Sequence, residues 1–419
     1  MDTIFAESTP PGRGGVSIIR LSGPEARAAA ESLAGPLPEA RRAELRTLRD
    51  LGEVLDQAFA LRFEAGASFT GEEVVELHLH GAPVIARRVE AALLARGLRH
   101  AEAGEFTRRA FLNGRIDLAE AEGLADLLEA ETEAQRRLAM SVASGGIGRQ
   151  GERWRNMLIR AGALIEVSVD FADEEVPEDI PAEVFETLDL LRAEFDREIG
   201  GFAAAERCRV GFEVAVIGPP NAGKSSLINR IARREVAIVS EIAGTTRDVI
   251  ELRIDLRGLA VTFLDTAGLR DTADPVESIG VGRARDRAEA ADLRLHLSEG
   301  GGVLDGAPWR AGDIAVRTKA DLTGTDGVSA VTGAGIDGLL GEIYQRLSQR
   351  VAGAGLISHQ RQLAALADAR DALTDIDGLP AELLAEAVRR SAAALDRLVG
   401  KIGAEDYLDV IFSSFCIGK

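Results

Sequence analysis

The sequence predicts a multidomain chain in which an α+β part is followed by a helical bundle, and an α/β part is inserted into that bundle. Its 419 residues are enough for two to four domains of roughly 100 to 200 residues each. The spacing of apolar residues changes at Leu118, at about Arg209 and at about Arg350, and each change is a switch between strand-like and helical patterns. We therefore expect an α+β domain at 1–117, a helical domain made of 118–208 and 351–419, and an inserted α/β domain at 209–350.

The composition is that of a folded globular protein. Hydrophobic residues make up 46% and charged residues 28% of the chain, which argues against a disordered, collagen-like or membrane-embedded protein. The formal net charge is −19, so the chain as a whole does not attract phosphate backbones or anionic lipids. Contact with a nucleic acid would therefore need a local basic patch or a partner protein.

Cysteine usage and the start of the chain favour a cytoplasmic protein. Cys208 and Cys416 lie far apart in sequence and cannot form a disulfide framework, as expected in a reducing compartment. The first residues lack the basic and apolar regions of a signal peptide, and no stretch approaches the roughly eighteen apolar residues of a membrane span. We expect neither export nor a membrane contact.

The outer domains show simple patterns. Near the N-terminus, the strand-like runs 16–21 and 74–80 are separated by glycine, proline and two helical patterns, which indicates an α+β domain. From Leu118 to about Phe195, and again after Arg350, leucine and alanine recur at helical spacing. The two helical blocks flank the α/β block, so we expect them to pack together.

A glycine-rich motif follows the first strand of the inserted domain. Residues 218–225 read Gly-Pro-Pro-Asn-Ala-Gly-Lys-Ser and match G-x-x-x-x-G-K-[ST], between strand-like 213–217 and helix-like 226–231. In such a loop the backbone N–H groups surround phosphates, Lys224 reaches the β- and γ-phosphates, and Ser225 holds Mg²⁺. The alternative is an ordinary glycine turn before a helix.

Two further motifs supply the rest of a phosphate site. Asp265-Thr266-Ala267-Gly268 closes the strand-like run 260–264; its aspartate can hold the metal through water, and the Gly268 N–H can meet the γ-phosphate. Between the two motifs lies 244–248, in which Thr246 is our choice for completing the Mg²⁺ shell. The run 250–256 that follows alternates strictly, which predicts an antiparallel edge strand with one solvent-exposed face.

A base-binding motif follows a later strand. Thr318-Lys319-Ala320-Asp321 comes directly after 313–317, and its aspartate can accept from N1–H and from the exocyclic amine of guanine, a donor pair that adenine lacks. Ser329-Ala330 can contact the guanine carbonyl through the backbone. In this order the motifs resemble a translation-factor-class GTPase, so we expect a Ras-like P-loop GTPase domain. That pattern has asparagine where Thr318 stands, which predicts one hydrogen bond fewer to the base.

Together the motifs define the GTP site that we expect. Lys224 is also a catalytic candidate, because it touches the transferred phosphate. The GTP-binding residues are predicted to be Asn221, Ala222, Gly223, Lys224, Ser225, Ser226, Ser240, Glu241, Ile242, Ala243, Gly244, Thr245, Thr246, Asp265, Thr266, Ala267, Gly268, Thr318, Lys319, Ala320, Asp321, Ser329, Ala330 and Val331.

The residue that orients water in Ras-type GTPases is missing. Those proteins place glutamine after the glycine of the second motif, where this chain has Leu269. Unaided domains turn over at about 10⁻⁴ s⁻¹, and an arginine supplied in trans is worth about 10⁵. Asn221 could instead ligate a monovalent cation against the phosphates, with carbonyls of residues 240–245 closing the shell. Potassium would then replace the arginine, and we expect the GTPase domains to dimerise during hydrolysis.

Glu277 is the candidate for orienting the attacking water. It lies on the segment that follows Asp265, which moves with the γ-phosphate in related domains. The alternative is a solvated loop carboxylate.

Several stretches outside these motifs carry a resemblance to a known family. The chain ends in Cys416-Ile417-Gly418-Lys419, and the stretches 9–16, 68–72 and 104–114 are also characteristic. With the loop at 221–224 they make the chain similar, over its whole length, to the MnmE (TrmE) tRNA-modification GTPases.

This resemblance implies a homodimer whose N-terminal domain binds a tetrahydrofolate, and a potassium-dependent GTPase domain. It also implies a heterotetramer with the FAD-dependent MnmG (GidA) protein. Together the two proteins would add a carboxymethylaminomethyl- or aminomethyl-type group at carbon 5 of the wobble uridine of certain tRNAs. A 5-formyl- or 5,10-methylene-tetrahydrofolate would supply the carbon, and FAD or NADH the redox chemistry.

The resemblance also implies ligands, residue by residue. Arg20, Glu76, Arg115 and Lys419 would contact the folate, Asn221, Ser240, Ile242 and Thr245 the potassium, and Ser225 and Thr246 the magnesium. Arg115 stands where the family has lysine, which keeps the charge but changes its geometry.

Plainer interpretations remain open at several of these positions. Arg20 and Glu76 could form a surface ion pair, and Cys416 could be a small side chain without a chemical role. His78 and His80 share one strand face, but without a visible third ligand a structural role is favoured over a metal pair.

The inserted domain departs from the family at 297–300, and the segment 300–312 is short. Two other functions would use the same nucleotide motifs. A regulatory GTPase in ribosome assembly would have no use for the folate-like domain or the C-terminal tail, and an ATPase would bind ATP as well as GTP. Because the chain is acidic, we expect the flavoprotein partner to make much of the tRNA contact.

Overall fold

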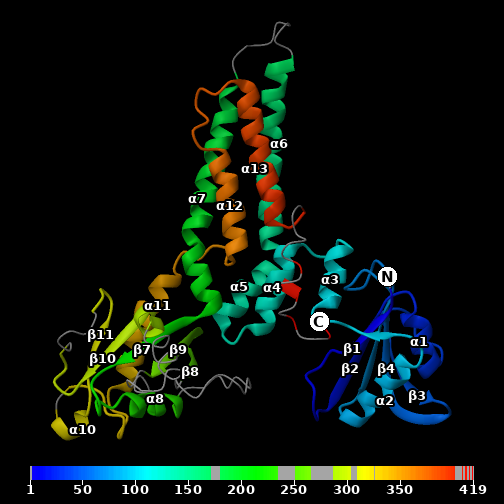
Figure 1. The fold of residues 1–419 in the computed structure, drawn as a ribbon, viewed down its shortest axis with the longest axis horizontal. Coiled ribbons are helices and arrows are strands. Elements are labelled where there is room, and N and C mark those ends of the chain that lie inside the picture. Colours follow the sequence, from blue (N-terminus) through cyan, green and yellow to red (C-terminus); the bar gives the residue numbers. More distant parts are fainter. Residues whose placement is uncertain are drawn as a thin grey trace, which may run out of the picture. The chain divides into compact units, whose positions relative to one another are not determined.

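The computed structural model describes residues 2–170, 180–234, 251–265, 286–302, 309–324 and 326–401, together with residues 408, 411, 412, 415 and 418. The chain divides into two compact units (Figure 1). The first contains Met1–Ala125, Gly148–Glu152 and Ala393–Lys419, and the second contains Asp126–Ile147 and Arg153–Ala392. The three-domain boundaries expected from the sequence stay a prediction.

The first unit is built on a six-stranded sheet in the order β3-β4-β5-β2-β1-β6. Its neighbouring strands are antiparallel, except that β1 and β6 are parallel. Every second residue of β2 is buried, as the period of two in a one-sided sheet requires. The strands are β1 (Ile4–Glu7), β2 (Val16–Ser22), β3 (Ala43–Asp50), β4 (Glu53–Phe63), β5 (Val74–His80) and β6 (Arg99–His100).

Helices cover one face of this sheet. Residues of α1 (Ala26–Ala34) and α2 (Pro83–Leu94) share a hydrophobic core with alternate residues of β2, β4 and β5. A third helix, α3 (Glu105–Leu112), follows β6. The α+β class expected for this part is confirmed.

The described residues of the C-terminal segment pack inside the first unit. Leu408, Phe412 and Phe415 form a cluster with Leu118 and Ala121, which belong to the first turns of α4 (Leu118–Glu129). Gly104 precedes α3 with φ 65°, and a Cβ there would lie 2.4 Å from the Phe412 carbonyl oxygen, so only glycine fits. Further on, Ser8 Oγ donates to the Gly418 carbonyl oxygen at 3.0 Å. Gly418 therefore lies beside the end of β1.

Long helices form much of the second unit. Helix α7 contacts α12, Ser391 Oγ of α13 donates to the Ala369 carbonyl oxygen of α12 at 2.9 Å, and the rings of Trp154 in α6 and Phe195 in α7 pack edge to face. The predicted helical class of this region is thus confirmed, whereas a single helical domain made of 118–208 and 351–419 stays a prediction. The helices are α5 (Glu133–Ala143), α6 (Gly146–Asp170), α7 (Ala182–Val210), α12 (Gln360–Ala372) and α13 (Ala381–Leu398).

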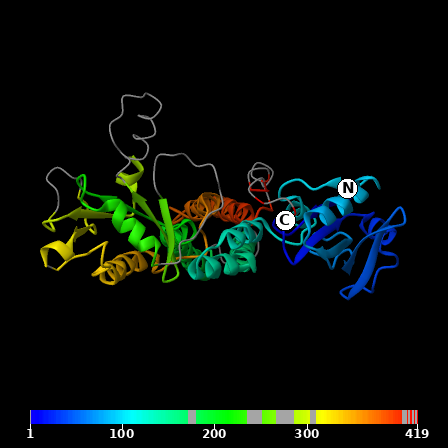
Figure 2. The same cartoon turned by 90° about the horizontal axis from the view of Figure 1, so that it is seen from below.

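The second unit also holds a five-stranded sheet in the order β11-β10-β7-β9-β8. Its strands are labelled in Figure 1, and Figure 2 shows the same ribbon turned by 90°. The strands are parallel except for β8, which pairs antiparallel with β9 at one edge and buries every second residue. This confirms the predicted edge strand. The strands are β7 (Phe212–Ile217), β8 (Glu251–Leu256), β9 (Leu259–Asp265), β10 (Leu293–Ser298) and β11 (Ile314–Arg317), and the helices are α8 (Lys224–Ala232), α10 (Ala320–Thr323) and α11 (Ile336–Val351).

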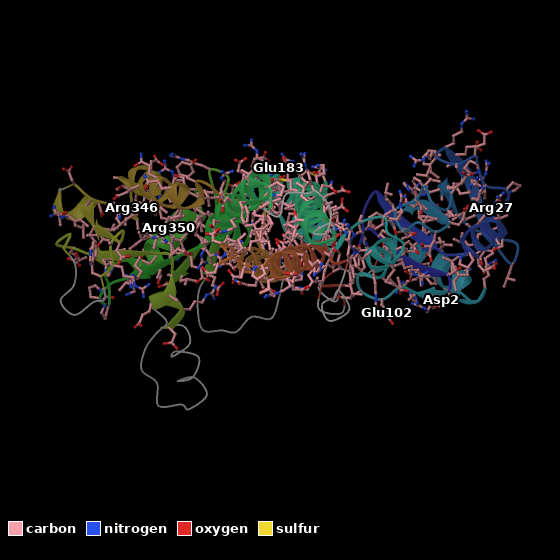
Figure 3. All side chains as sticks on the ribbon, turned by 90° about the horizontal axis from the view of Figure 1, so that it is seen from above. Asp2, Arg27, Glu102, Glu183, Arg346 and Arg350 are labelled. Carbon is pink, nitrogen blue, oxygen red and sulfur yellow. The ribbon has the colours of Figure 1, made fainter. Side chains whose placement is uncertain are left out.

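The two faces of β10 differ. Its leucines belong to the hydrophobic core with α8 and α11, whereas Arg294 and His296 are buried on the other face and both contact the Asp313 carboxylate. Arg346, labelled in Figure 3, donates to the Asp313 carbonyl oxygen at 2.7 Å. Buried charges require such partners. Among the described residues, no helix is both long and apolar enough to cross a membrane.

Candidate functional site

The loop between β7 and α8 has the curled shape that its glycines predict. Asn221 and Gly223 have φ of 65° and 91°, and the Ala222 N–H donates to the Pro219 carbonyl oxygen at 3.2 Å. At Gly218 a Cβ would lie 2.7 Å from the Leu297 carbonyl oxygen of β10. The loop, which we call the phosphate loop (residues 218–225), therefore needs glycine at its first position for packing and at its sixth for backbone conformation.

Lys224 begins α8 and bends back over the loop. Its Nζ donates to the carbonyl oxygens of Gly218 at 2.8 Å and Pro219 at 3.1 Å. The side chain is largely buried; burial lowers the pKa of Lys224, and the charge of Asp265 acts in the opposite direction. The ammonium thus lies over the loop, where the β- and γ-phosphates bind in loops of this sequence.

Asp265 and Ser225 offer the oxygen ligands that Mg²⁺ prefers. Asp265 ends β9, is paired in register with Val216 of β7, and is only 2% exposed. Ser225 is the second residue of α8. Mg²⁺ in nucleotide sites takes one or two protein oxygens and completes its shell with phosphate and water, so these residues fit the ion. No group of three or more histidine, cysteine, aspartate or glutamate residues that would form an all-protein metal site occurs in the described part of the chain.

A cavity of about 330 Å³ joins the phosphate loop to the base motifs. Its size lies at the low end of ligand pockets, roughly 300 to 1,000 Å³. The sequence prediction named nine of the residues that line it: Asn221, Ala222, Gly223, Ser226, Thr318, Lys319, Asp321, Ala330 and Val331. The structure thus brings together motifs that lie about a hundred residues apart in the chain.

Three lining residues were missed: Leu227, Leu322 and Val328. They belong to no nucleotide motif, so a motif search could not find them. Leu322 follows Asp321 directly and is 77% exposed, which is unusual for leucine and suits contact with the flat face of a base. The sequence offered one indication: Leu322 stands next to Asp321, the residue predicted to bind the guanine base.

Hydrogen bonds connect the base motif at 318–321 to the end of β10 and to Val328, which precedes the second base motif. The Thr318 N–H donates to the Ser298 carbonyl oxygen at 3.0 Å, and the Ala320 N–H donates to the Val328 carbonyl oxygen at 3.2 Å. Lys319 lies in the left-handed region with φ 58°, and its Nζ pairs with Glu299. Glu299 belongs to the segment that departs from the family, so this contact was not expected. It holds the base motif against the end of β10.

Ser329 and Thr318 are both buried, but they differ in their hydrogen bonds. The Ser329 N–H donates to the Ala334 carbonyl oxygen at 3.0 Å, and Ser329 Oγ accepts from the Thr332 N–H at 3.1 Å. Thr318 is 4% exposed, and its Oγ1 has no hydrogen-bond partner among the residues that the structure describes. A buried hydroxyl without a partner lowers stability. The fold of the described residues therefore does not require a hydroxyl at position 318.

In the first unit, Arg20 and Glu76 form a partly buried pair. They are register partners on β2 and β5, and their side chains meet at 3.0 Å with 26% and 14% exposure. The Arg20 guanidinium also lies 5.7 Å from the Phe106 ring centre. Of the alternatives left open, the ion pair is therefore present, and it is more buried than an ordinary surface pair.

His78, His80 and Arg115 each contact other residues of the first unit. His78 Nε2 contacts Glu76 Oε2 at 3.1 Å, and His80 Nδ1 contacts Asp56 Oδ1 at 2.7 Å, so both histidines have carboxylate partners. The aliphatic part of Arg115 packs against the turn at Gly71, where a Cβ would meet its Cγ at 3.2 Å.

Some predicted residues lie outside the described part of the chain. They are Ser240, Glu241, Ile242, Ala243, Gly244, Thr245, Thr246, Thr266, Ala267, Gly268, Glu277, Cys416 and Lys419. Their assignments remain predictions.

The chain matches known proteins over its full length. Residues 3–115 match the family described as GTP-binding protein TrmE N-terminus, and residues 118–416 match the MnmE helical domain. Proteins named tRNA modification GTPase MnmE are 61% identical in Paracoccus denitrificans, 53% in Cereibacter sphaeroides (strain ATCC 17029) and 51% in Dinoroseobacter shibae, and each match covers 100% of both chains. The chain therefore belongs to the MnmE family of tRNA modification GTPases.

Proposed function

We propose that this chain hydrolyses GTP at the phosphate loop as part of tRNA modification. The observation that carries the proposal is the cavity that joins this loop to the base motif containing Asp321. In it, Lys224 would bind the β- and γ-phosphates, and Ser225 and Thr246 would hold Mg²⁺ with Asp265 acting through water. Asp321 would accept from the guanine edge, which disfavours ATP as the substrate because adenine lacks that donor pair.

Potassium would supply the positive charge that an arginine supplies in other GTPases. Asn221 supports this role, because it lines the cavity and stands at the left-handed bend of the phosphate loop. Its side-chain oxygen, with oxygens of Ser240, Ile242 and Thr245, would surround the ion. The ion would neutralise charge that develops on the phosphates, while Glu277 orients the attacking water. The GTPase domains would dimerise during hydrolysis.

A tetrahydrofolate would bind to the first unit of a homodimer. Arg20 and Arg115 offer cations for the folate carboxylates, and Glu76 offers an acceptor for ring N–H groups. Ser8 Oγ donates to the Gly418 carbonyl oxygen at 3.0 Å, so Gly418 lies beside the sheet that carries Arg20, and Lys419 would contact the folate as the family resemblance implies. A 5-formyl- or 5,10-methylene-tetrahydrofolate would there donate its carbon.

The modification itself would need a partner. With a net charge of −19, this chain is a weak binder of nucleic acid by itself. We therefore assign much of the tRNA contact, and the FAD, to MnmG (GidA) in a cytoplasmic heterotetramer that modifies carbon 5 of the wobble uridine. The match at residues 3–115 to the TrmE N-terminus favours this role over ribosome assembly.

Complementation of a strain that lacks its own MnmE tests the proposal. We expect the wild-type chain to restore the modified wobble uridine, as measured by mass spectrometry of tRNA nucleosides, and Lys224→Ala to fail at equal protein level. Lys401→Ala, an exposed lysine far from the loop in sequence, is the matched control. Full restoration by Lys224→Ala would overturn the proposal.

A further inference from the structure

Strand β8 is connected by ion pairs to elements on two sides. Glu251, its first residue, pairs with Arg287, which also pairs with Glu213 of β7. Two residues further along β8, Arg253 pairs with Glu131 at 2.5 Å. Glu131 precedes α5, so the edge strand of the nucleotide-binding sheet is tied to the helical region.

The turn after β8 completes the start of α5. Arg257 and Gly258 have φ of 53° and 93°, as in the tight turns that suit hairpins. The Gly258 carbonyl oxygen accepts a hydrogen bond from the Ala134 N–H at 3.2 Å. Ala134 lies in the first turn of α5, where backbone N–H groups have no partner within the helix. The hairpin thus satisfies one of the donors that α5 leaves open.

The same turn of α5 also contacts the element that leads to the phosphate loop. Gln135 Nε2 donates to the Arg209 carbonyl oxygen at 2.8 Å. Arg209 is in the last turn of α7, and β7, which follows directly, ends at the phosphate loop. The first turn of α5 therefore contacts two elements of the nucleotide-binding sheet: the hairpin between β8 and β9, and the end of α7, which leads directly into β7.

The region where the first turn of α5 meets β8 and the end of α7, which we call the joint, contains a cavity. A cavity of about 220 Å³ is lined by Asp126, Glu129, Gln135, Leu138, Ala139, Arg209, Val210 and Arg253. Close-packed cores resist small displacements, whereas a joint with a cavity and ion pairs can adopt two arrangements without opening a core. The cavity therefore leaves room for β8 to shift against α5.

We propose that the contacts between the first turn of α5 and the β8 hairpin depend on whether GTP or GDP is bound. The inference rests on the proposed function, in which Thr246 and Asp265, on either side of the hairpin in sequence, contact Mg²⁺ and the γ-phosphate. With GTP those contacts hold the hairpin in the arrangement that bonds to α5, and with GDP they are lost. Because coupling between sites is reciprocal, breaking the joint must weaken GTP binding more than GDP binding.

Charge reversal tests the coupling in the full-length protein. The dissociation constants of GDP and of a non-hydrolysable GTP analogue are measured for the wild type, Glu131→Arg, Arg253→Glu and the double variant. We expect each single reversal to lower the preference for the GTP analogue by about fivefold or more, in the usual range for coupled sites, and the double reversal to restore it. Arg192→Glu, which breaks an exposed pair with Asp189 in α7, is the control and should change neither constant.

Hydrogen exchange of the wild type gives a second measurement that needs no variant to fold. Amides of residues 133–136 should exchange more slowly with the GTP analogue than with GDP. Equal exchange in both states, or charge reversals that change both dissociation constants by the same factor, would overturn the coupling while leaving the proposed GTPase intact. Failure of the wild type to bind either nucleotide would overturn both.

Discussion

The Lys224 ammonium donates a hydrogen bond to the carbonyl oxygen of Gly218, the first residue of the phosphate loop and six positions earlier in the chain, at 2.8 Å. The phosphate loop is therefore closed by its own lysine, and a bound nucleotide would compete with these carbonyls for the ammonium. This closed form requires Gly218 to sit against β10 and Lys224 to start α8. The loop shape thus depends on contacts that individual substitutions can test.

Gly218→Ala should damage the loop. The added Cβ would lie 2.7 Å from the Leu297 carbonyl oxygen, so the loop or β10 must shift, and we expect a loss of about 1–3 kcal/mol in the free energy of unfolding with weaker GDP binding. Gly200→Ala in α7 is the control: no atom lies within 4 Å of its Cβ, and a helix gains about 0.5–1 kcal/mol from alanine. Urea unfolding checks both, and equal stability of the two variants would contradict the prediction.

Thr318→Asn should strengthen guanine binding. Asparagine would add the hydrogen bond that threonine does not make, and one such bond is worth roughly 1 kcal/mol, or about fivefold in affinity. Titration with a fluorescent GDP analogue measures the change. Thr318→Val is the control. It removes a buried hydroxyl without a partner among the described residues, so we expect unchanged affinity and a raised free energy of unfolding. Weaker GDP binding by Thr318→Asn would disprove the argument.

Asp313→Asn should cost stability at neutral pH and less in acid. Burial alone would raise the pKa of Asp313, but the Arg310 N–H and the Arg294 side chain outweigh it, so the pKa lies below its ordinary value of 3.8. A lowered pKa in the folded state stabilises the protein above the ordinary pKa, and this stabilisation is lost as pH falls through the folded value. Removing one member of a buried pair costs about 3–5 kcal/mol.

Denaturant unfolding from pH 7 to pH 3 measures this effect. The difference between wild type and Asp313→Asn should be largest above about pH 5 and should shrink below about pH 4. The double variant Arg294→Met, Asp313→Leu should recover most of the loss, because it leaves no unpaired charge. A difference that stays constant over the whole pH range would show that the carboxylate charge is not responsible.

Arg20→Gln should weaken folate binding. A charged hydrogen bond is worth about 1.5–3 kcal/mol, so we expect the dissociation constant of 5-formyltetrahydrofolate to rise about tenfold or more in calorimetry. Arg27→Gln is the matched control, since Arg27 (Figure 3) forms an exposed pair with Glu31 on α1. Equal binding by wild type and Arg20→Gln would remove Arg20 from the site.

The sequence predicted the parts of the fold that depend on local pattern. The strict alternation at 250–256 identified β8 as an edge strand, and the glycines at 218 and 223 predicted a curled loop before α8, because both features follow from backbone geometry over a few residues. Nine of the residues that line the cavity were named from motifs alone.

The missed features depend on residues distant in sequence. Arg253 pairs with Glu131 and Lys319 with Glu299, and no local pattern contains both members of either pair. Arg294 and His296 alternate with leucines, as on a half-exposed strand, yet both are buried because Asp313 of the next strand segment contacts them. Such pairs become visible only when the strands are placed side by side.

GTP turnover by the purified full-length chain, with Mg²⁺ present and at equal ionic strength in potassium or sodium, tests the central claim most directly. The account predicts turnover in potassium that is lowered at least about tenfold in sodium, abolished in Lys224→Ala, and no longer dependent on potassium in Asn221→Ala. Undiminished turnover by Lys224→Ala would contradict the assignment of the phosphate loop, and equal wild-type rates in the two salts would contradict the role given to Asn221.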